Sequence, residues 1–382
     1  MNRVRARGIR SVVANAGNWA GSPTFATPEA VRPAPPARFA DTATIVADPY
    51  ARTQHETMTN TTTFHYDAII VGGGAAGLSA ALALGRARRS VLVLDAGEPR
   101  NAPASGVHNF LTRDGTPPGE LTRLGRAEVE SYGGIIVTDA AASATKTGDR
   151  FAVTMAGGKV FEGRRLLVAT GLTDELPDVP GLREHWGTFV LHCPYCHGWE
   201  VRDRVIGILG TGPMSVHKAL LFRQWSARIT LFLHTAPQPS DEELEQLAAR
   251  GITVVEGTVA SVEGSDGQLS RVTLDDGSTH AIDALVVSPN FVANTDLLEQ
   301  LGVDVQPHPM GVGSFVETDP MGATSVPGVY AAGNVTDLMA QVVTSAAEGL
   351  RAGAAINGDL MQEDTRDAVA AYRQRLAVGA AS

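Results

Sequence analysis

Two cysteines and two histidines lie within six residues of one another in the stretch HCPYCHGWE, residues 192–200. A Cys-x-x-Cys-His pattern occurs where haem is attached covalently, in half of a zinc site and in redox-active dithiols. Cys193 and Cys196 are the only cysteines, and a zinc site completed by His192 and His197 would take all its ligands from one short segment, whereas structural sites use separated pairs. Covalent haem attachment normally takes place outside the cytoplasm, and the sequence contains no pattern that indicates export. A redox dithiol and an inert pair of thiols remain.

A glycine-rich turn is the second feature that indicates chemistry. Gly72, Gly74 and Gly77 form a Gly-x-Gly-x-x-Gly pattern, with Asp95 further along. The first glycine permits a tight turn, the second lets a pyrophosphate approach the backbone, the third lets helix and strand pack, and the acid can bond ribose hydroxyls. The amides of a helix that starts here would face the phosphates. The pattern predicts a dinucleotide site.

The elements around this turn are those that such a site requires. The run HYDAIIV, residues 65–71, predicts a strand, residues 78–86 a helix, and SVLVLD, residues 90–95, a second strand. Residues 68–85 are uncharged and long enough to suggest a membrane helix. Their consecutive glycines suit a turn far better than a helix interior, so we expect a soluble βαβ unit.

Composition excludes several classes of protein. A chain of 382 residues with 43% apolar residues predicts two domains with substantial cores. The formal net charge of -10 argues against binding nucleic acid or an anionic membrane, because both need a basic surface. The first 57 residues carry seven arginines against four acids without sustained periodicity, so we predict a disordered extension. Without a convincing signal peptide we expect a cytoplasmic protein.

The element pattern repeats after residue 182. VIGIL (205–209), a GTGPMS turn, a helix at 216–225 and RITLFL (228–233) follow the first pattern, and 241–250 predicts a further helix. Before them, FAVTMA, KVFEGR and RLLVAT predict a small antiparallel meander. We therefore expect an α/β protein with two Rossmann-like, three-layer nucleotide-binding domains, the second inserted into the first. The expected boundaries are a disordered extension at 1–57, an FAD-binding domain at 64–182 and 289–360, an NAD(P)-like domain carrying the Cys-x-x-Cys at 183–288, and a C-terminal helix or tail at 361–382.

Taken in this order, the motifs resemble thioredoxin reductase and its relatives from about residue 64 to 360. VATGLTDELPDVPGL matches that family's Ala-Thr-Gly crossover, and VPGVYAAGNVTD, residues 326–337, resembles its second flavin motif. In that motif an Asp after the glycine binds the ribityl chain, and this chain has Asn334 instead, whose amide can still hydrogen-bond a hydroxyl. The resemblance implies FAD as cofactor and a homodimer. The FAD-binding residues we expect are Gly72, Gly74, Ala76, Gly77, Asp95, Asn101, Gly333, Asn334, Gln341 and Val342, the last two near the start of a helix that begins around Ala340.

The same resemblance assigns roles at the dithiol. It implies that Cys196 contacts the flavin and that Cys193 exchanges with the substrate. Thioredoxin reductases usually have an Asp directly after the second cysteine as proton donor. Here the residue is His197, whose unperturbed pKa of roughly 6.5 suits proton transfer near neutral pH. Catalysis is thus expected from Cys193, Cys196 and His197, without a metal.

The second nucleotide turn departs from that family more strongly. Gly210 and Gly212 are kept, but Pro213 removes an amide donor and Ser215 replaces a smaller residue. Thioredoxin reductases hold the NADP 2'-phosphate with an arginine cluster, whereas LFLHTAPQPSDEELEQL contains none and is rich in acids, which repel a phosphate. His234 and Thr235 stand where a carboxylate would favour NAD. These differences disfavour NADPH as the electron donor.

Three functions follow from this combination. The CPYCHGWE stretch and the degraded turn are similar to the dithiol oxidases of gliotoxin and holomycin biosynthesis, a thioredoxin reductase-like group that uses oxygen, and we favour an FAD-dependent dithiol oxidase. The first alternative is a reductase that draws electrons from NAD(P)H or a protein donor. The second is a flavin redox sensor with little turnover. The expected partner is a small dithiol or a thioredoxin-like protein, and the sequence does not choose between them.

Overall fold

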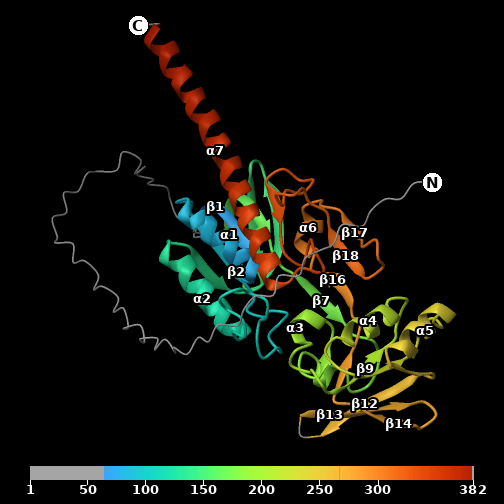
Figure 1. Ribbon diagram of the computed structural model, residues 1–382. Helices are drawn as coiled ribbons and strands as arrows, with labels where there is room; N and C mark the ends of the chain where they lie inside the picture. Colours follow the sequence, from blue (N-terminus) through green and yellow to red (C-terminus); the bar gives the residue numbers. More distant parts are fainter. Residues whose placement is uncertain (1–63, 266, 381–382) are drawn as a thin grey trace, which may run out of the picture. The chain divides into compact units, whose positions relative to one another are not determined.

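The computed structural model describes residues 64–265 and 267–380 (Figure 1). The predicted disordered extension at 1–57 lies outside these residues. The helices are α1 Ala75–Arg86, α2 Pro118–Ser131, the 3-10 helix Arg183–His185, α3 Pro194–His197, α4 Ser215–Phe222, α5 Asp241–Ala249, α6 Asp296–Gln300 and α7 Val342–Ala380. The strands are β1 Phe64–Val71, β2 Val91–Asp95, β3 Ile135–Thr138, β4 Ala141–Thr147, β5 Arg150–Met155, β6 Val160–Val168, β7 Leu172–Glu175, β8 Val190–Leu191, β9 Val205–Leu209, β10 Arg228–Phe232, β11 Thr253–Val255, β12 Val259–Ser265, β13 Gln268–Leu274, β14 Thr279–Ala281, β15 Ala284–Val286, β16 Asn290–Ala293, β17 Val305–Pro307, β18 Gly313–Val316 and β19 Val329–Ala331.

The first sheet has the strand order β3-β2-β1-β6-β5-β4, with β19 also paired to β6. Strand β1 pairs in parallel with β2 and β6, and its apolar residues 68–71 are buried. Helix α1 begins three residues before the predicted start, because the chain turns into the helix directly after the extended Gly74. Residues 68–85 are therefore a strand, a turn and a helix. Within the described part of the chain, no helix is long and apolar enough to cross a membrane.

The predicted meander is present but has fewer breaks. Strand β5 pairs antiparallel with β4 and with β6. KVFEGR and RLLVAT, which the sequence divides into two runs, belong largely to the single strand β6, because β6 also pairs with β1 along its length. The meander is thus continuous with the parallel sheet.

A second parallel sheet follows the crossover, with the order β11-β10-β9-β15-β8. Strands β12 to β14 form a separate antiparallel sheet, and β7, β16, β17 and β18 form a fourth sheet. Helix α5 starts at a capping box in which Ser240 and Glu243 bond each other's backbone N–H. Because β19 returns to the first sheet after these strands, the second Rossmann-like unit is inserted into the first, as the sequence predicts.

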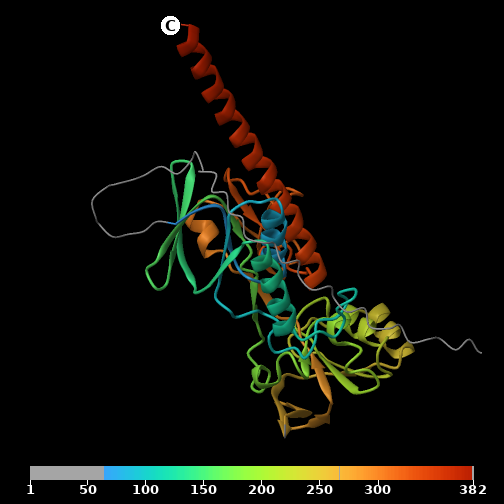
Figure 2. The same cartoon turned by 90° about the vertical axis from the view of Figure 1, so that its left-hand side faces the viewer.

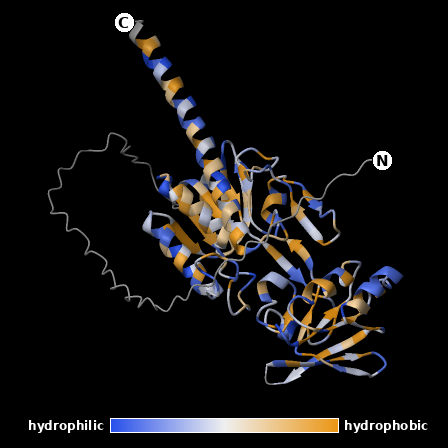
Figure 3. Ribbon diagram, viewed as in Figure 1, coloured by the Kyte–Doolittle hydropathy of each residue, from blue (hydrophilic) through white to orange (hydrophobic). Residues whose placement is uncertain are grey.

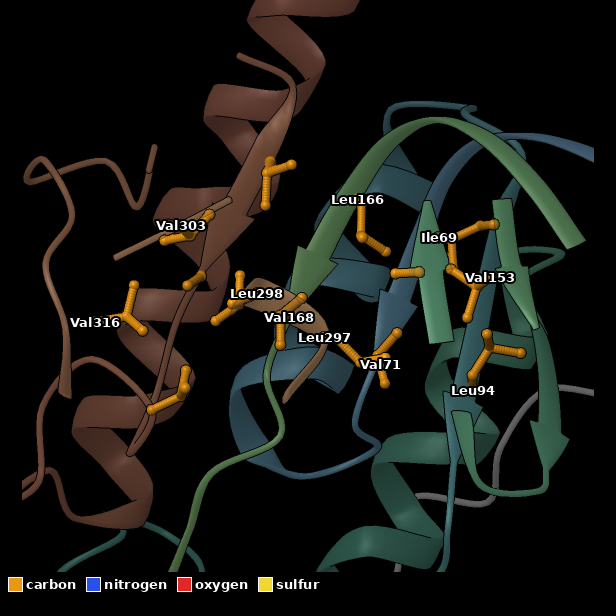
Figure 4. Close-up of a cluster of buried hydrophobic side chains, with 14 of the residues drawn as sticks. Ile69, Val71, Leu94, Val153, Leu166, Val168, Leu297, Leu298, Val303 and Val316 are labelled. Carbon is orange, nitrogen blue, oxygen red and sulfur yellow. The ribbon is translucent and has the colours of Figure 1, made fainter. Parts of the chain in front are cut away.

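Buried apolar side chains hold the first sheet in place. Figure 4 shows Leu297 and Leu298 of α6 near Val71 and Val168 of the sheet. Each fully buried aliphatic side chain contributes about 1.5–3 kcal/mol relative to exposure. Figure 3 shows hydrophobic residues along the central strands of both sheets. The buried strands therefore hold the turns at their ends in fixed positions.

Helix α7 is 39 residues long and runs without a break past residue 360, where the sequence predicts a boundary before a separate C-terminal helix or tail. It packs closely on α1, since a Cβ on Gly349 would lie 1.9 Å from the carbonyl oxygen of Ala76. Further along, Glu363 pairs with Arg164 and Arg165 of β6. Residues 364–378 are exposed, and Figure 2 shows this end of α7 extending away from the sheet. The start of α7 is thereby held against the first glycine turn.

Candidate active site

One cavity of about 1170 Å³ gathers most of the residues that the sequence singles out. The volume exceeds the roughly 300–1,000 Å³ typical of small-ligand pockets. The predicted residues that line it are Gly72, Gly74, Ala76, Asp95, Asn101, Cys193, Cys196, His197, Gly333, Asn334, Gln341 and Val342. Gly77 does not line it. The glycine turn and the dithiol therefore open on the same space.

The glycines of the first turn are needed for different reasons. Gly72 has a φ of +108°, and a Cβ there would lie 2.2 Å from the carbonyl oxygen of Ala169. A Cβ on Gly77 would lie 1.9 Å from the carbonyl oxygen of Gly72, so Gly77 serves packing behind the cavity. A Cβ on Gly74 would meet no atom of the described residues within 4 Å. Gly74 thus leaves space on the cavity side, where a group from outside the chain can approach the backbone.

Asp95 lies at the end of β2 and is tied on both oxygens. Its Oδ1 accepts a hydrogen bond from the Gly73 N–H at 3.1 Å, and its Oδ2 lies 3.2 Å from Nη2 of Arg126. Both side chains line the cavity. The buried Nε of Arg126 has no hydrogen-bond partner within the described residues. The donor set at this end of the cavity suits the oxygen acceptors of a nucleotide.

Asn334 faces the cavity from the other side. Its Nδ2 donates to the carbonyl oxygens of Asp337 and Ala340, both at 2.9 Å, and its Oδ1 accepts from Nη1 of Arg100 at 3.3 Å. Arg100 also makes two 2.7 Å bonds to the buried carboxylate of Asp174. The amide therefore shapes the approach to α7, which an aspartate could not do because it lacks the two donors.

Cys193 and Cys196 form a disulfide. Cys193 caps the short helix α3 in an extended conformation, and its Sγ accepts the Cys196 N–H at 3.2 Å. Pro194 occupies the first helical position, where a missing N–H costs nothing. Both cysteines are partly buried. The pair is thus reachable from the cavity while its backbone is fixed.

His197 follows on the same helix and also lines the cavity. Burial lowers its pKa from 6.5, Glu200 opposes the shift and His108 adds to it. At neutral pH the imidazole is therefore uncharged and can accept a proton. His192 differs. Its ring packs edge-on against Phe291 at 5.1 Å between centroids, and burial, with smaller contributions from nearby cations, lowers its pKa to about 3.

A loop from the first domain reaches this helix. His108 lies 3.4 Å from Asp114 through Nδ1 and 3.4 Å from Glu200 through Nε2. Asn109 donates through Nδ2 to the carbonyl oxygen of Tyr195 at 2.8 Å and to Oε1 of Gln341 at 3.4 Å. Except for the contact between His108 and Asp114, these contacts join residues far apart in the sequence, and the sequence gives no signal for them.

The second glycine turn, between β9 and α4, is closed by its own side chain. The buried Ser215 donates through Oγ to the carbonyl oxygen of Gly212 at 2.6 Å, and the Gly212 N–H points back to that Oγ at 3.4 Å. His234, two residues after the end of β10, accepts the Val259 N–H through Nδ1 at 3.0 Å. The amide and the strand-end side chain that a dinucleotide would use are thus occupied within the chain.

Comparison with known proteins decides the family. The model of the pyridine nucleotide-disulphide oxidoreductase family matches residues 66–349. The chain belongs to this family. Among curated relatives, the oxidoreductase is similar to "Thioredoxin reductase sirT" of Leptosphaeria maculans, with 33% identity over 78% of this chain and 95% of the relative. It is also similar to "Thioredoxin reductase tcpT" of Claviceps purpurea (strain 20.1), with 32% identity over the same shares.

Two solved structures extend the likeness. The structure of HlmI has 43% identity and a TM-score of 0.76, covering 84% of this chain and all of HlmI. An oxidoreductase from Agrobacterium tumefaciens has 39% identity and a TM-score of 0.74, covering 78% of this chain and 99% of that one. The chain is therefore an FAD-dependent oxidoreductase that acts on a sulfur group, with the two-domain fold expected.

The cavity of the oxidoreductase fits FAD. The space beside Gly74, the buried Nε of Arg126 that has no partner within the described residues, and the dithiol belong to the same cavity and suit a phosphate group, a polar nucleotide and a redox ring, respectively. Three contributors are absent from the sequence-based prediction: Gly73, Arg126 and Arg100. Gly73 is signalled by the run of three glycines. The two arginines stand in segments without a recognisable pattern.

Proposed function

We propose that this oxidoreductase is a dithiol oxidase, which forms a disulfide in its substrate and uses oxygen as the final electron acceptor. The observation that carries the proposal is the second turn, where the N–H and the carbonyl of Gly212 bond Ser215 and no arginine follows between Arg228 and Arg250. A reductase fed by NADPH needs the second turn for its donor. An oxidase receives electrons at the disulfide and does not.

The exchange proceeds on the cysteine pair. A substrate thiolate attacks Sγ of Cys193, the Cys193–Cys196 bond breaks, and Cys196 leaves as a thiolate. The second substrate thiol, deprotonated by His197, attacks the substrate sulfur of this mixed disulfide. The product disulfide forms and Cys193 leaves as a thiolate. The substrate has then lost two electrons and two protons, and the cysteine pair has gained the electrons.

The geometry around the disulfide supports these roles. The Cys196 N–H that donates to Sγ of Cys193 stabilises a thiolate on Cys193, which is the group expelled when the product forms. His197 is uncharged at neutral pH because burial lowers its pKa. FAD, when bound, accepts the electron pair of the reduced cysteines and delivers it to oxygen as peroxide. We assign Cys196 to the flavin side, following the family's pattern.

FAD binding is assigned to the predicted residues around the cavity. We propose that Gly74 and Ala76 face the pyrophosphate, that Gly72 and Gly77 shape the turn, and that Asp95 faces the ribose. The other contacts come from Asn101 and from Gly333, Asn334, Gln341 and Val342 near the start of α7. We further propose that 64–182 with 289–360 is the FAD-binding domain and that 183–288 carries the dithiol.

Product analysis tests the reaction. A small dithiol in air should give one equivalent of peroxide for each disulfide formed, without nicotinamide. Disulfide formation without peroxide would remove oxygen as the acceptor. We also propose that the enzyme is a cytoplasmic homodimer. Light scattering in solution and fractionation of the source cells test these two points.

The second candidate is a reductase that works in the opposite direction. It is favoured by the names of the two curated relatives above, both of which are called thioredoxin reductases. Such an enzyme would take electrons from NAD(P)H through an atypical site, or from a protein donor. Reduction of a thioredoxin disulfide with consumption of one nicotinamide would establish it.

A further inference from the structure

Residues 107–116 form a loop that reaches from the glycine-turn domain to the dithiol, and we call it the docking loop. A bridge between Val107 and Thr116 closes its base. Inside it, Asn109 has a φ of +61° and Thr112 a φ of +74°. Asp114 accepts the Asn109 N–H at 2.9 Å. The loop therefore holds Asn109 in a conformation that few residues other than glycine adopt readily.

The side-chain amide of Asn109 donates two hydrogen bonds to segments outside the docking loop. One hydrogen bond of 2.8 Å reaches the carbonyl oxygen of Tyr195, which lies between the two cysteines. A second, at 3.4 Å, reaches Oε1 of Gln341, directly before α7. His108 adds a contact to Glu200, just after the dithiol helix.

We propose that Asn109 is a positioning residue that fixes the Cys193–Cys196 helix against the start of α7, where the flavin is held. This inference rests on the proposed function. It concerns the placement of the dithiol helix relative to the flavin, which neither the cysteines nor the glycine turn fixes. Electron transfer from the cysteines needs a fixed placement of sulfur against the flavin, and a misplacement of about 1 Å can cost about 100-fold in rate. Substrate exchange at the disulfide needs no such placement.

Two variants separate the hydrogen bonds from the strained backbone. Asn109→Asp keeps the shape but replaces the donor with an oxygen facing two acceptors. Asn109→Gly removes the side chain and relaxes the positive φ. Thr112→Gly is the matched control, because it relaxes a similar φ in the same loop without touching α3 or Gln341.

The first measurement needs neither substrate nor cofactor. Hydrogen exchange of the apoprotein should rise in residues 193–200 of both Asn109 variants and stay at the wild-type level in Thr112→Gly. Equal exchange in all four proteins would overturn the proposal, whatever the enzyme's reaction is.

The second measurement is an anaerobic single turnover of the FAD-loaded enzyme with dithiothreitol, sampled for oxidised dithiothreitol and for flavin absorbance. Both Asn109 variants should form the first disulfide at the wild-type rate and bleach the flavin about 10- to 100-fold more slowly. Bleaching at the wild-type rate would overturn the positioning role. If the wild-type enzyme forms no oxidised dithiothreitol, the proposed function is wrong. The hydrogen-exchange measurement would still decide the role of Asn109.

Discussion

The two glycine turns of this enzyme lie at equivalent places in their sheets but differ in the contacts that their residues make. Each follows a buried parallel strand, β1 or β9, and precedes a helix. At Gly74 the first turn leaves free space beside the backbone, and its neighbour Gly77 is packed against Gly72. At the second turn Ser215 fills the hydrogen-bonding positions. In the function we propose, the first turn binds a cofactor and the second mainly supports the dithiol.

Matched substitutions at the two turns should show the largest difference. Gly74→Val places a side chain where the pyrophosphate must approach, so we expect colourless protein with no activity. Gly212→Val is the control, because a Cβ at Gly212 also meets no atom of the described residues within 4 Å. It should remain yellow and fully active. The flavin absorbance of the two purified proteins shows whether FAD binding depends on the first turn alone. Loss of the yellow colour in both variants, or in neither, would contradict the comparison.

Removing the exchanging thiol tests where electrons enter. Cys193→Ser should keep FAD bound and lose dithiol oxidation altogether, because no disulfide remains to accept the substrate. Flavin reduction by light should stay normal, which excludes a damaged cofactor site. A variant that still oxidised dithiols would show that electrons bypass the cysteine pair.

The histidine next to the dithiol should have a smaller effect with a pH signature. In the proposed reaction His197 acts as a base while it is neutral, and burial lowers its pKa from 6.5. Wild-type activity should therefore persist at pH 7 and fall as the pH drops through that lowered pKa. His197→Ala should slow turnover by about 100-fold, the lower end of general acid–base contributions, and lose this acid limb. An unchanged profile would remove His197 from the reaction.

Reopening the second turn should have the smallest effect. Thr235→Arg adds one cation beside the strand end and Ser215→Ala frees the turn, yet the other arginines are still missing. An exposed charge pair contributes at most about 1 kcal/mol, so we expect NADPH to bind no more than about fivefold tighter. Rapid flavin reduction by NADPH in this double variant would show that Ser215 and the missing cation alone keep NADPH from the second turn.

Local patterns predicted the parts of the fold that local physics determines. The run 65–71 and the glycines after it specify a strand and a turn, and Cys193 and Cys196 need no context to suggest a dithiol. Other features depend on partners distant in the sequence. The amide of Asn109 meets Tyr195 and Gln341 only in the folded chain, and Asn334 is used mainly for the backbone before α7. The altered second turn was visible in the sequence as missing arginines and as Ser215, but the hydrogen bonds between Ser215 and Gly212 were not.

Anaerobic flavin absorbance tests the central claim most directly, with NADPH, NADH and dithiothreitol added separately before air is admitted. We expect dithiothreitol alone to bleach the flavin. On exposure to oxygen the yellow colour should return and one equivalent of peroxide should form. Full bleaching by one equivalent of either nicotinamide would contradict the claim, because it would show that the second turn still binds its cofactor.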